Sequence, residues 1–187
     1  MSNTILEQFG LSPLAHLKSN KSLINNGVWN DTIIEGMEMS FKVRSAEYKA
    51  FLAEVQPKFA KLNSKGDGNV DIEKAKAVAR SGYSNHILVD WVTYIKEEMY
   101  AAICAAYPDV KIKTLGKTYL GSIDNDPLPD GYIAVNCIFF SEDGSPLLYT
   151  PANAKTALEV QDIMDKVQSM SGDTSMYTVA KSIKSSS

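Results

Sequence analysis

Alternating apolar and polar positions mark the clearest element of the chain. Every second residue from Met37 to Val43 is apolar, and the residues between them are polar or charged. A period of two is typical of a strand with one buried face. The apolar run Val28–Ile34 precedes this strand, and the dipeptide Glu35-Gly36 separates the two segments. We therefore predict a β-hairpin over residues 28–44.

Apolar positions change to helical spacing between residues 45 and 107. The first helix of this region contains Pro57, which predicts a kink or a helix end just before it. Apolar residues at intervals of three and four continue from Ser84 to Pro108 and predict a longer helix that includes Trp91. Residues 45–107 are therefore expected to form a helical core.

Capping residues indicate where two further helices begin. Asp71 can accept a hydrogen bond from the first turn of a short helix that Gly82 would end. Thr150 is followed by Pro151, and a capping hydroxyl before a proline is typical of a helix start. We predict a C-terminal helix over residues 150–172.

The pattern changes again between residues 108 and 148. Val110–Thr114 alternates, Tyr132–Phe140 has the composition of a buried strand, and the acidic, proline-rich segment Asp124–Gly131 lies between them. Short alternating or continuous apolar runs bounded by turn residues predict strands. We therefore expect a small β-rich insertion in an otherwise helical protein.

These patterns predict an α+β fold that is mainly helical, with an N-terminal β-hairpin, packed helices and a small β-rich insertion. A length of 187 residues with 44% hydrophobic residues suits one domain of ordinary size. The expected order in this single domain, residues 1–187, is a flexible N-terminal arm (1–27), the hairpin (28–44), the helical core (45–107), the β-rich insertion (108–148), the C-terminal helix (150–172) and a tail (173–187).

Charge and hydropathy argue against two classes of partner. The net charge is −3, whereas nucleic-acid binding needs a basic surface. Nine basic and five acidic residues give residues 42–80 a charge of +4, and one lysine and eight acidic residues give residues 122–165 a charge of −7. This separation indicates either ordinary solvated surfaces or a polarised docking surface. No apolar run approaches the roughly 18 residues of a membrane helix, and the first residues do not resemble a secretory leader. We expect a cytoplasmic protein that binds neither nucleic acid nor membrane.

Two loops resemble known ligand-binding motifs only in part. Residues 63–71 are similar to a calcium-binding loop between two helices, but Lys65 and Lys74 stand at ligand positions, where a cation repels the ion. Gly116-Lys117-Thr118 is similar to the end of a phosphate-binding loop, but Lys111 stands where the first glycine belongs. We favour plain turns in both places.

Residues that could ligate a metal or attack a substrate lack partners at suitable spacing. An acidic loop could gather a hard cation, although such loops are common on protein surfaces. The histidines and cysteines show neither zinc-ligand spacing nor a redox pair. The sequence therefore predicts no enzyme, no cofactor, no metal site and free thiols; the residues considered are Asp124, Asp126, Asp130, His16, His86, Cys104 and Cys137.

Three stretches stand out in order along the chain. The first contains Asn26-Gly27-Val28-Trp29 and, later, Phe41-Lys42-Val43-Arg44; the second is His86-Ile87-Leu88-Val89-Asp90-Trp91; the third is Asp143-Gly144-Ser145-Pro146-Leu147-Leu148-Tyr149-Thr150-Pro151-Ala152-Asn153-Ala154. Together they resemble the tail assembly chaperones of long-tailed bacteriophages. The third is the most specific, because it is similar to the family's turn into its last helix.

The spacing of these stretches differs from the family pattern, in which the tryptophan lies a few residues before the Asp-Gly turn. Trp91 and Asp143 are 52 positions apart. Either Lys96–Phe140 is inserted material, or Val135-Asn136-Cys137 occupies the position of the tryptophan and the tryptophan itself is missing.

The resemblance implies a non-enzymatic chaperone in the cytoplasm of the host bacterium. Its expected client is the tape measure protein, a long, helix-rich and aggregation-prone chain that it would keep soluble during tail assembly. Tail-tube subunits and a second copy of the chain are further expected partners, and the protein would not be part of the mature virion. The alternative is a structural virion component, either a small tail subunit or a head–tail connector subunit.

Large apolar residues in or near these three stretches are candidates for contact with the client. Methionine suits adaptable client surfaces, and large aromatic residues anchor many protein interfaces. The same residues are also ordinary candidates for a hydrophobic core. The residues considered for partner binding are Trp29, Met39, Phe41, Trp91 and Tyr149.

Overall fold

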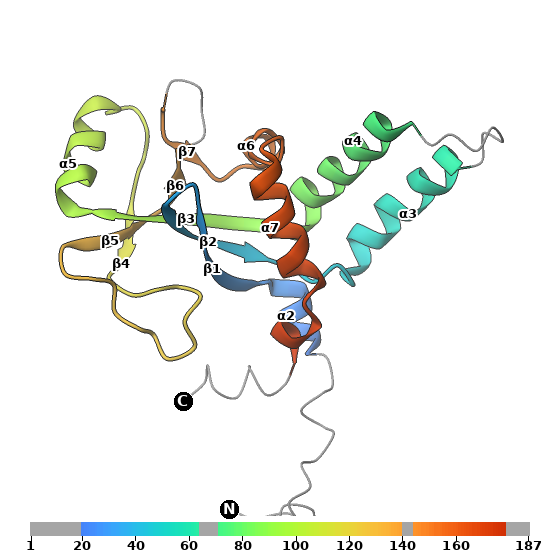
Figure 1. The fold of residues 1–187 in the computed structure, drawn as a ribbon, viewed down its shortest axis with the longest axis horizontal. Coiled ribbons are helices and arrows are strands. Elements are labelled where there is room, and N and C mark those ends of the chain that lie inside the picture. Colours follow the sequence, from blue (N-terminus) through green and yellow to red (C-terminus); the bar gives the residue numbers. More distant parts are fainter. Residues whose placement is uncertain (1–19, 64–70, 140–143, 179–187) are drawn as a thin grey trace, which may run out of the picture.

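The computed structural model describes residues 20–63, 71–139 and 144–178 (Figure 1). Its centre is an antiparallel sheet of five strands in the order β1-β2-β3-β5-β4. Two further short strands pair with each other. The strands are β1 (Val28–Ile34), β2 (Met37–Val43), β3 (Leu88–Lys96), β4 (Thr114–Gly116), β5 (Tyr132–Val135), β6 (Cys137–Ile138) and β7 (Leu147–Leu148).

The helices surround this sheet unevenly. In Figure 1, α3 and α4 lie side by side and project from one end of the sheet, while α5 lies at the other end. None of the described helices is both long and apolar enough to cross a membrane. The helices are α2 (Lys21–Asn26), α3 (Lys49–Asn63), α4 (Ile72–Gly82), the π-helical turn η2 (Tyr83–Ile87), α5 (Glu97–Ala106), α6 (Pro151–Ala157), α7 (Gln161–Gly172) and the 3-10 turn η3 (Thr174–Tyr177).

The prediction of a mainly helical fold is wrong. Of the residues that the structure describes, 47% are helical and 25% are in strands or bridges. The largest error concerns β3, which helical spacing predicted as part of a helix from residue 84 to residue 107. Trp91 and Ile95 are buried on one face of β3, and Val92 and Tyr94 are buried on the other. A strand that is covered on both faces is apolar throughout, so periodicity cannot distinguish it from a buried helix.

Residues 108–148 complete this sheet instead of forming an insertion beside a helical core. β5 pairs with β3 from Thr93–Val135 to Lys96–Tyr132, and β4 pairs with the other side of β5. Two of the five strands therefore come from this segment. The expected helical core over residues 45–107 is also wrong, because the central strand of the sheet lies within it.

The predicted hairpin is confirmed and forms a two-residue turn. β1 and β2 pair from Val28–Val43 to Ile34–Met37. The connecting residues Glu35 and Gly36 both have positive φ angles, 49° and 80°, as a type I′ turn requires. This turn determines where β2 begins and which of its residues lie beside β3.

Local capping signals are confirmed, but the helix lengths are not. Asp71 accepts a hydrogen bond from the Lys74 N–H at 3.1 Å, and Thr150 accepts one from the Asn153 N–H at 3.0 Å. The helix that Gly82 was expected to end continues directly into η2. The expected single helix over residues 150–172 is two helices, α6 and α7, separated at residues 158–160.

α3 continues through Pro57, where we expected a kink or an end. A proline removes the hydrogen bond to the carbonyl four residues earlier, which here belongs to Ala53. Both residues are exposed, so water can satisfy that carbonyl. The helix therefore extends to Asn63.

The described parts of the expected arm and tail are folded. Residues 21–26 form α2, and Tyr177 in η3 is buried and donates a hydrogen bond to the Val43 carbonyl at 3.0 Å. The Asn20 N–H donates to the Tyr177 carbonyl at 2.6 Å, which joins these two segments. The remaining residues of the predicted arm and tail lie outside the described residues.

Candidate functional site

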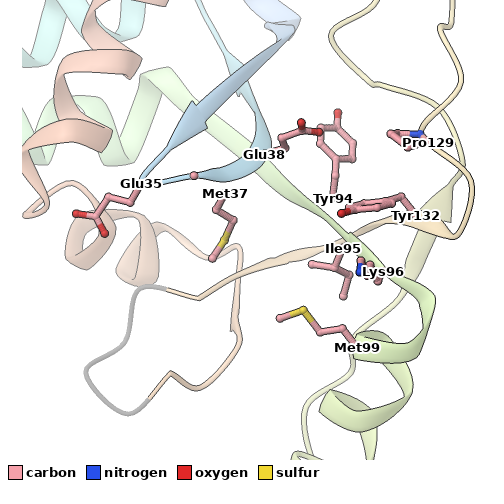
Figure 2. A pocket seen from close by; sticks show the side chains of 10 residues that line it. Glu35, Met37, Glu38, Tyr94, Ile95, Lys96, Met99, Pro129 and Tyr132 are labelled. Atoms are coloured by element: carbon pink, nitrogen blue, oxygen red, sulfur yellow. The ribbon is translucent and has the colours of Figure 1, made fainter.

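A pocket of about 530 Å³ lies where β2 and β3 separate (Figure 2). The pairing of these two strands ends at Met39–Thr93, whereas β3 continues, paired with β5, as far as Lys96–Tyr132. The hairpin turn therefore lies beside a stretch of β3 that pairs on one side only. Pockets of 300–1,000 Å³ are the usual size for ligand sites.

Apolar side chains form much of the pocket, and Figure 2 shows them on both strands. Met37 comes from the first position of β2, Ile95 from β3, and Met99 from the first turn of α5. Met99 is 44% exposed. Two unbranched methionine side chains around an open cavity can adapt to occupants of different shape.

Charged groups of both signs lie at the edge of this apolar surface. Glu35 and Glu38 come from the β1–β2 hairpin, and Lys96 comes from the junction of β3 and α5. Lys96 is the N-cap residue of α5, with extended backbone angles (φ −67°, ψ 143°), and Glu97 and Glu98 follow in the first turn. Acidic residues there stabilise the positive end of the helix. They favour a helix start directly after β3, which places Met99 in the first turn of α5.

A segment over residues 117–131, which we call the strap, covers the sheet face opposite α6 and α7. Two hydrogen bonds fix it to the pocket and to β1. The Tyr119 hydroxyl donates to the Glu38 carboxylate at 2.9 Å, and the Gly121 N–H donates to the Asp31 carboxylate at 3.1 Å. Glu38 therefore belongs to both the pocket and the strap contacts.

Tyr94 connects the strap to the sheet through one buried hydroxyl. It donates to the Asp31 carboxylate at 2.7 Å and accepts a hydrogen bond from the Leu120 N–H at 2.8 Å. Burial raises the pKa of Tyr94, and its hydrogen bond to the Asp31 carboxylate raises it further. The hydroxyl consequently stays protonated and keeps donating over the whole range in which proteins are folded.

The acidic loop within the strap is closed by its own hydrogen bonds. Asp126 accepts from the Ser122 hydroxyl at 2.7 Å, and that hydroxyl accepts from the Asp124 N–H at 3.2 Å. Among the residues that the structure describes, no three histidine, cysteine or acidic side chains are grouped so that they could hold a metal ion. Most of the calcium-like loop at residues 63–71 lies outside the described residues.

The two thiols lie in one hydrophobic cluster beneath α5. Cys137 is buried and Cys104 is partly buried, and both are free. Burial raises the pKa of Cys137 to about 12. Since the thiolate is the reactive form, Cys137 is an inert core residue.

The residues considered for partner binding lie mostly in the core. Met39, Phe41 and Trp91 are fully buried, and Phe41 pairs directly with Trp91 across β2 and β3. Tyr149 is partly buried, and its ring contacts that of Trp91 with centroids 5.2 Å apart. Four of the five residues are thus brought together, but as the packing between the sheet and the segment before α6.

Trp29 lies on the opposite sheet face, away from these four residues. It is partly exposed and packs against the cluster of residues beneath the strap. The Lys42 Nζ atom lies 5.9 Å from the centroid of its ring. This position is near a second, smaller pocket of about 250 Å³ between β1 and the strap.

Sequence reasoning missed the pocket residues, of which Met37, Tyr94 and Met99 are the most informative. Met37 directly follows the predicted turn, but the alternation placed it on the buried face of the strand. Tyr94 and Met99 gave no usable signal, since their segment was predicted as one continuous helix.

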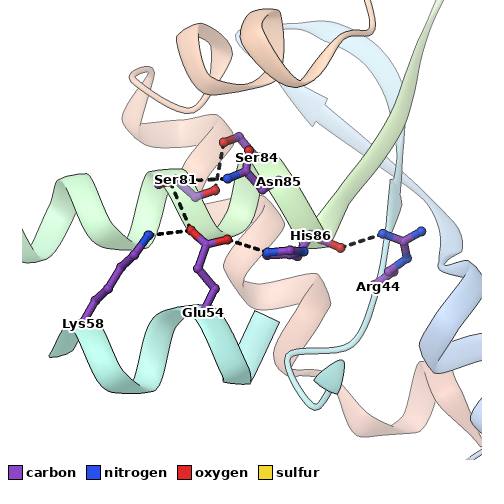
Figure 3. A network of polar contacts seen from close by, with 7 residues as sticks. All are labelled: Arg44, Glu54, Lys58, Ser81, Ser84, Asn85 and His86. Atoms are coloured by element: carbon purple, nitrogen blue, oxygen red, sulfur yellow. Dashed lines mark hydrogen bonds and ion pairs between the residues drawn. The ribbon is translucent and has the colours of Figure 1, made fainter. Parts of the chain in front are cut away.

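A second polar cluster, around Glu54, joins α3 to the end of α4 and to β2 (Figure 3). The Glu54 carboxylate accepts hydrogen bonds from Lys58 Nζ at 2.7 Å and from His86 Nε2 at 2.6 Å. The Arg44 guanidinium donates to the His86 carbonyl at 3.0 Å. The hydrogen bonds from Lys58 and His86 lower the pKa of Glu54 to about 2, because both favour the carboxylate. The cluster fixes the projecting helices to the sheet.

Comparison with known proteins finds no match. No protein-family profile, curated protein or solved structure matches the chain.

Proposed function

We propose that this protein is a tail assembly chaperone of a long-tailed bacteriophage, with no enzymatic activity of its own. Its client is the tape measure protein, which it keeps soluble in the bacterial cytoplasm until the tail tube is built around it. Tail-tube subunits bind at a later step, and the chaperone leaves before the particle is complete. The observation that carries the proposal is the open, methionine-lined pocket between β2 and β3.

The physical argument rests on what such a pocket can hold. Full burial of one leucine or phenylalanine side chain contributes about 1.5–3 kcal/mol. Two client side chains against Met37 and Met99 therefore contribute about 3–6 kcal/mol, which corresponds to a Kd of tens of micromolar at best. Weak, adaptable binding suits a chaperone, which must release its client. Repeated apolar segments along a long client would engage many copies at once.

The residues that carry the family resemblance support the proposal in a second way. Tyr149 donates a hydrogen bond to the Leu88 carbonyl at 2.6 Å, and the Asn153 side chain donates to the Leu148 carbonyl at 2.8 Å. Thr150 caps α6. These three side chains shape the junction between β7 and α6. The structure of this junction would therefore explain why other members of the family carry the same motif.

The test is co-expression of the chain with the tape measure protein of its phage, followed by measurement of the soluble client and by affinity co-purification. Met99→Asp is the pocket variant, and Ile72→Asp is the matched control, because Ile72 is a 66% exposed apolar residue on α4, outside the pocket. We expect the wild type and Ile72→Asp to keep the client soluble and Met99→Asp to fail. Equal solubility with both variants would contradict the pocket as the client site.

The alternative function, a structural virion component, gives a different result with purified particles. Quantitative mass spectrometry of the particles would find a tail or connector subunit at a fixed copy number and would not find a chaperone. Detection of this protein in the particles at a fixed copy number would favour the virion component and overturn the chaperone proposal.

A further inference from the structure

We infer that the pocket binds its occupant as an extended strand, which pairs with the free side of β3 between Tyr94 and Lys96. The inference deepens the proposed function, and the identity of the natural client rests on that function. The backbone argument below is independent of it.

Backbone alternation determines which groups of β3 face the pocket. In an antiparallel ladder, successive residues direct their N–H and C=O groups to opposite sides of the strand. The Glu97 N–H donates to the Gly131 carbonyl at 2.8 Å, so residue 97 is directed toward β5. Ile95 shares that direction, and the backbone groups of Tyr94 and Lys96 are directed to the other side.

That other side is where β2 no longer pairs. The last β2–β3 pair is Met39–Thr93. Because Thr93 is directed toward β5, this pair is closed by pairing of the Tyr94 N–H with the Glu38 carbonyl. The Lys96 carbonyl belongs to the first turn of α5, which Lys96 caps. The Tyr94 carbonyl and the Lys96 N–H are therefore the groups left for a partner at the pocket. These two groups flank Ile95, as the pairing of one residue in an antiparallel ladder requires. Exposed edges of this kind recruit further strands, and strand addition is a common mode of peptide recognition.

The pocket walls indicate the side chains of the occupant. An added strand would direct alternate side chains to the two faces of the sheet. On one face it would meet Met37 and Ile95, which are apolar, and on the other Tyr94, Glu38 and Lys96. The structure therefore fits an alternating sequence of aliphatic residues and small polar residues such as threonine.

A helix fits this place less well than a strand. Helical segments satisfy their backbone hydrogen bonds internally, so a docked helix would leave the Tyr94 carbonyl and the Lys96 N–H facing it without partners. Buried backbone groups are almost always paired. An extended client supplies those partners, and a chain that has not yet folded is extended when a chaperone meets it.

The probe is a fluorescein-labelled nonapeptide, Lys-Thr-Val-Thr-Val-Thr-Val-Thr-Lys, with binding measured by fluorescence anisotropy. Two versions carry N-methyl groups, on the valines in one and on the central threonines in the other. Lys96→Pro removes the Lys96 N–H, and the φ angle of −67° at this residue suits proline. Lys96→Ala is the reference, because it loses the same side chain but keeps the N–H. Thermal melting of both variants establishes that each is folded.

Strand addition predicts that the parent peptide binds Lys96→Pro at least about fivefold more weakly than Lys96→Ala, since a backbone hydrogen bond is lost. It also predicts that at least one N-methylated version binds about tenfold more weakly than the parent, because N-methylation blocks pairing. Equal binding to the two Lys96 variants, equal binding of all three peptides, or no binding to the wild type would overturn it.

The co-expression assay separates this inference from the proposed function. If Lys96→Ala and Lys96→Pro keep the client equally soluble, the chaperone function stands and the strand pairing is overturned. If the peptides bind with the expected pattern but the client stays insoluble, the strand pairing stands. The tape measure protein is then not the client.

Discussion

Trp91 and Tyr149, which are 58 positions apart in the chain, each donate a hydrogen bond to a backbone carbonyl in the segment of the other. The Trp91 indole N–H donates to the Leu147 carbonyl at 3.0 Å, and the Tyr149 hydroxyl donates to the Leu88 carbonyl at 2.6 Å. Their rings meet edge to face at 79°. β3 and the segment that precedes α6 are therefore held together by side chains from both.

This relationship predicts a coupled effect on stability. Tyr149→Phe should lower the free energy of unfolding by about 1–2 kcal/mol, because the Leu88 carbonyl loses its donor. Trp91→Phe should cost about 2–4 kcal/mol, because it removes a hydrogen bond and leaves a cavity. Urea unfolding of both single variants and the double variant would measure the coupling, which we expect to exceed 0.5 kcal/mol. Strict additivity would contradict a shared contact.

Gly82 is predicted to resist replacement by alanine, although alanine favours helices. A Cβ atom at this position would clash with Val55 Cγ2 and lie 2.9 Å from Phe51 Cε2. We expect Gly82→Ala to lower the free energy of unfolding by about 1–3 kcal/mol through overpacking.

Gly172 supplies the matched control for this prediction. It is the last residue of α7, and a Cβ atom there would have no neighbour within 4 Å. Gly172→Ala should therefore change the free energy of unfolding by less than about 1 kcal/mol and in the stabilising direction. Equal destabilisation by the two variants would contradict the packing around Gly82.

The Glu54 cluster predicts acid-sensitive stability. The pKa of Glu54 in the folded protein is about 2, below the ordinary value of 4.5, so its stabilising effect is present above pH 4.5 and is lost as the pH falls toward 2. The expected loss in unfolding free energy is about 1–2 kcal/mol, a figure that allows for solvent screening of this partly exposed group. Urea unfolding across this pH range would measure it.

Two substitutions isolate the contribution of this carboxylate. Glu54→Gln should be less stable than the wild type at neutral pH and should lack that part of the acid dependence. Glu73→Gln, at an exposed position on α4, should keep it. An unchanged acid dependence in Glu54→Gln would assign the effect to other groups.

Tyr94 is predicted to control how firmly the strap is held. Tyr94→Phe removes the donor to Asp31 and the acceptor of the Leu120 N–H, so it breaks two contacts, whereas Tyr119→Phe breaks only the one to Glu38. Amide hydrogen exchange of residues 117–131 should therefore increase more in Tyr94→Phe, by about five- to thirtyfold. A larger effect of Tyr119→Phe would mean that the contact with Glu38 holds the strap more firmly than the contacts of Tyr94.

Several local elements followed from the sequence alone because neighbouring residues determine them. The alternation around Met39, the Glu35-Gly36 turn, the Asp71 cap and the Thr150-Pro151 helix start all depend on interactions within about four residues. Such interactions form in the same way whatever surrounds them, so these predictions match the structure.

The central strand and the pocket depended on tertiary structure. Residues 88–96 carry apolar side chains that suit either a helix or a strand, and pairing with β2 and with residues 132–135 selected the strand. Burial on both faces removed the alternation that would have marked it. Residues 108–148 are β-rich, as predicted. That two of their strands join the central sheet could not be predicted, since their partner strand was assigned to a helix.

The sequence by itself determined the hairpin, the helix starts and the apolar character of Met37 and Met99. Only the tertiary structure decided that these two residues line one pocket beside a stretch of β3 that pairs on one side only. The physical reason is that a pocket forms where one strand ladder ends before the next one does, and the ends of the β2–β3 and β3–β5 ladders depend on pairing between residues more than 35 positions apart.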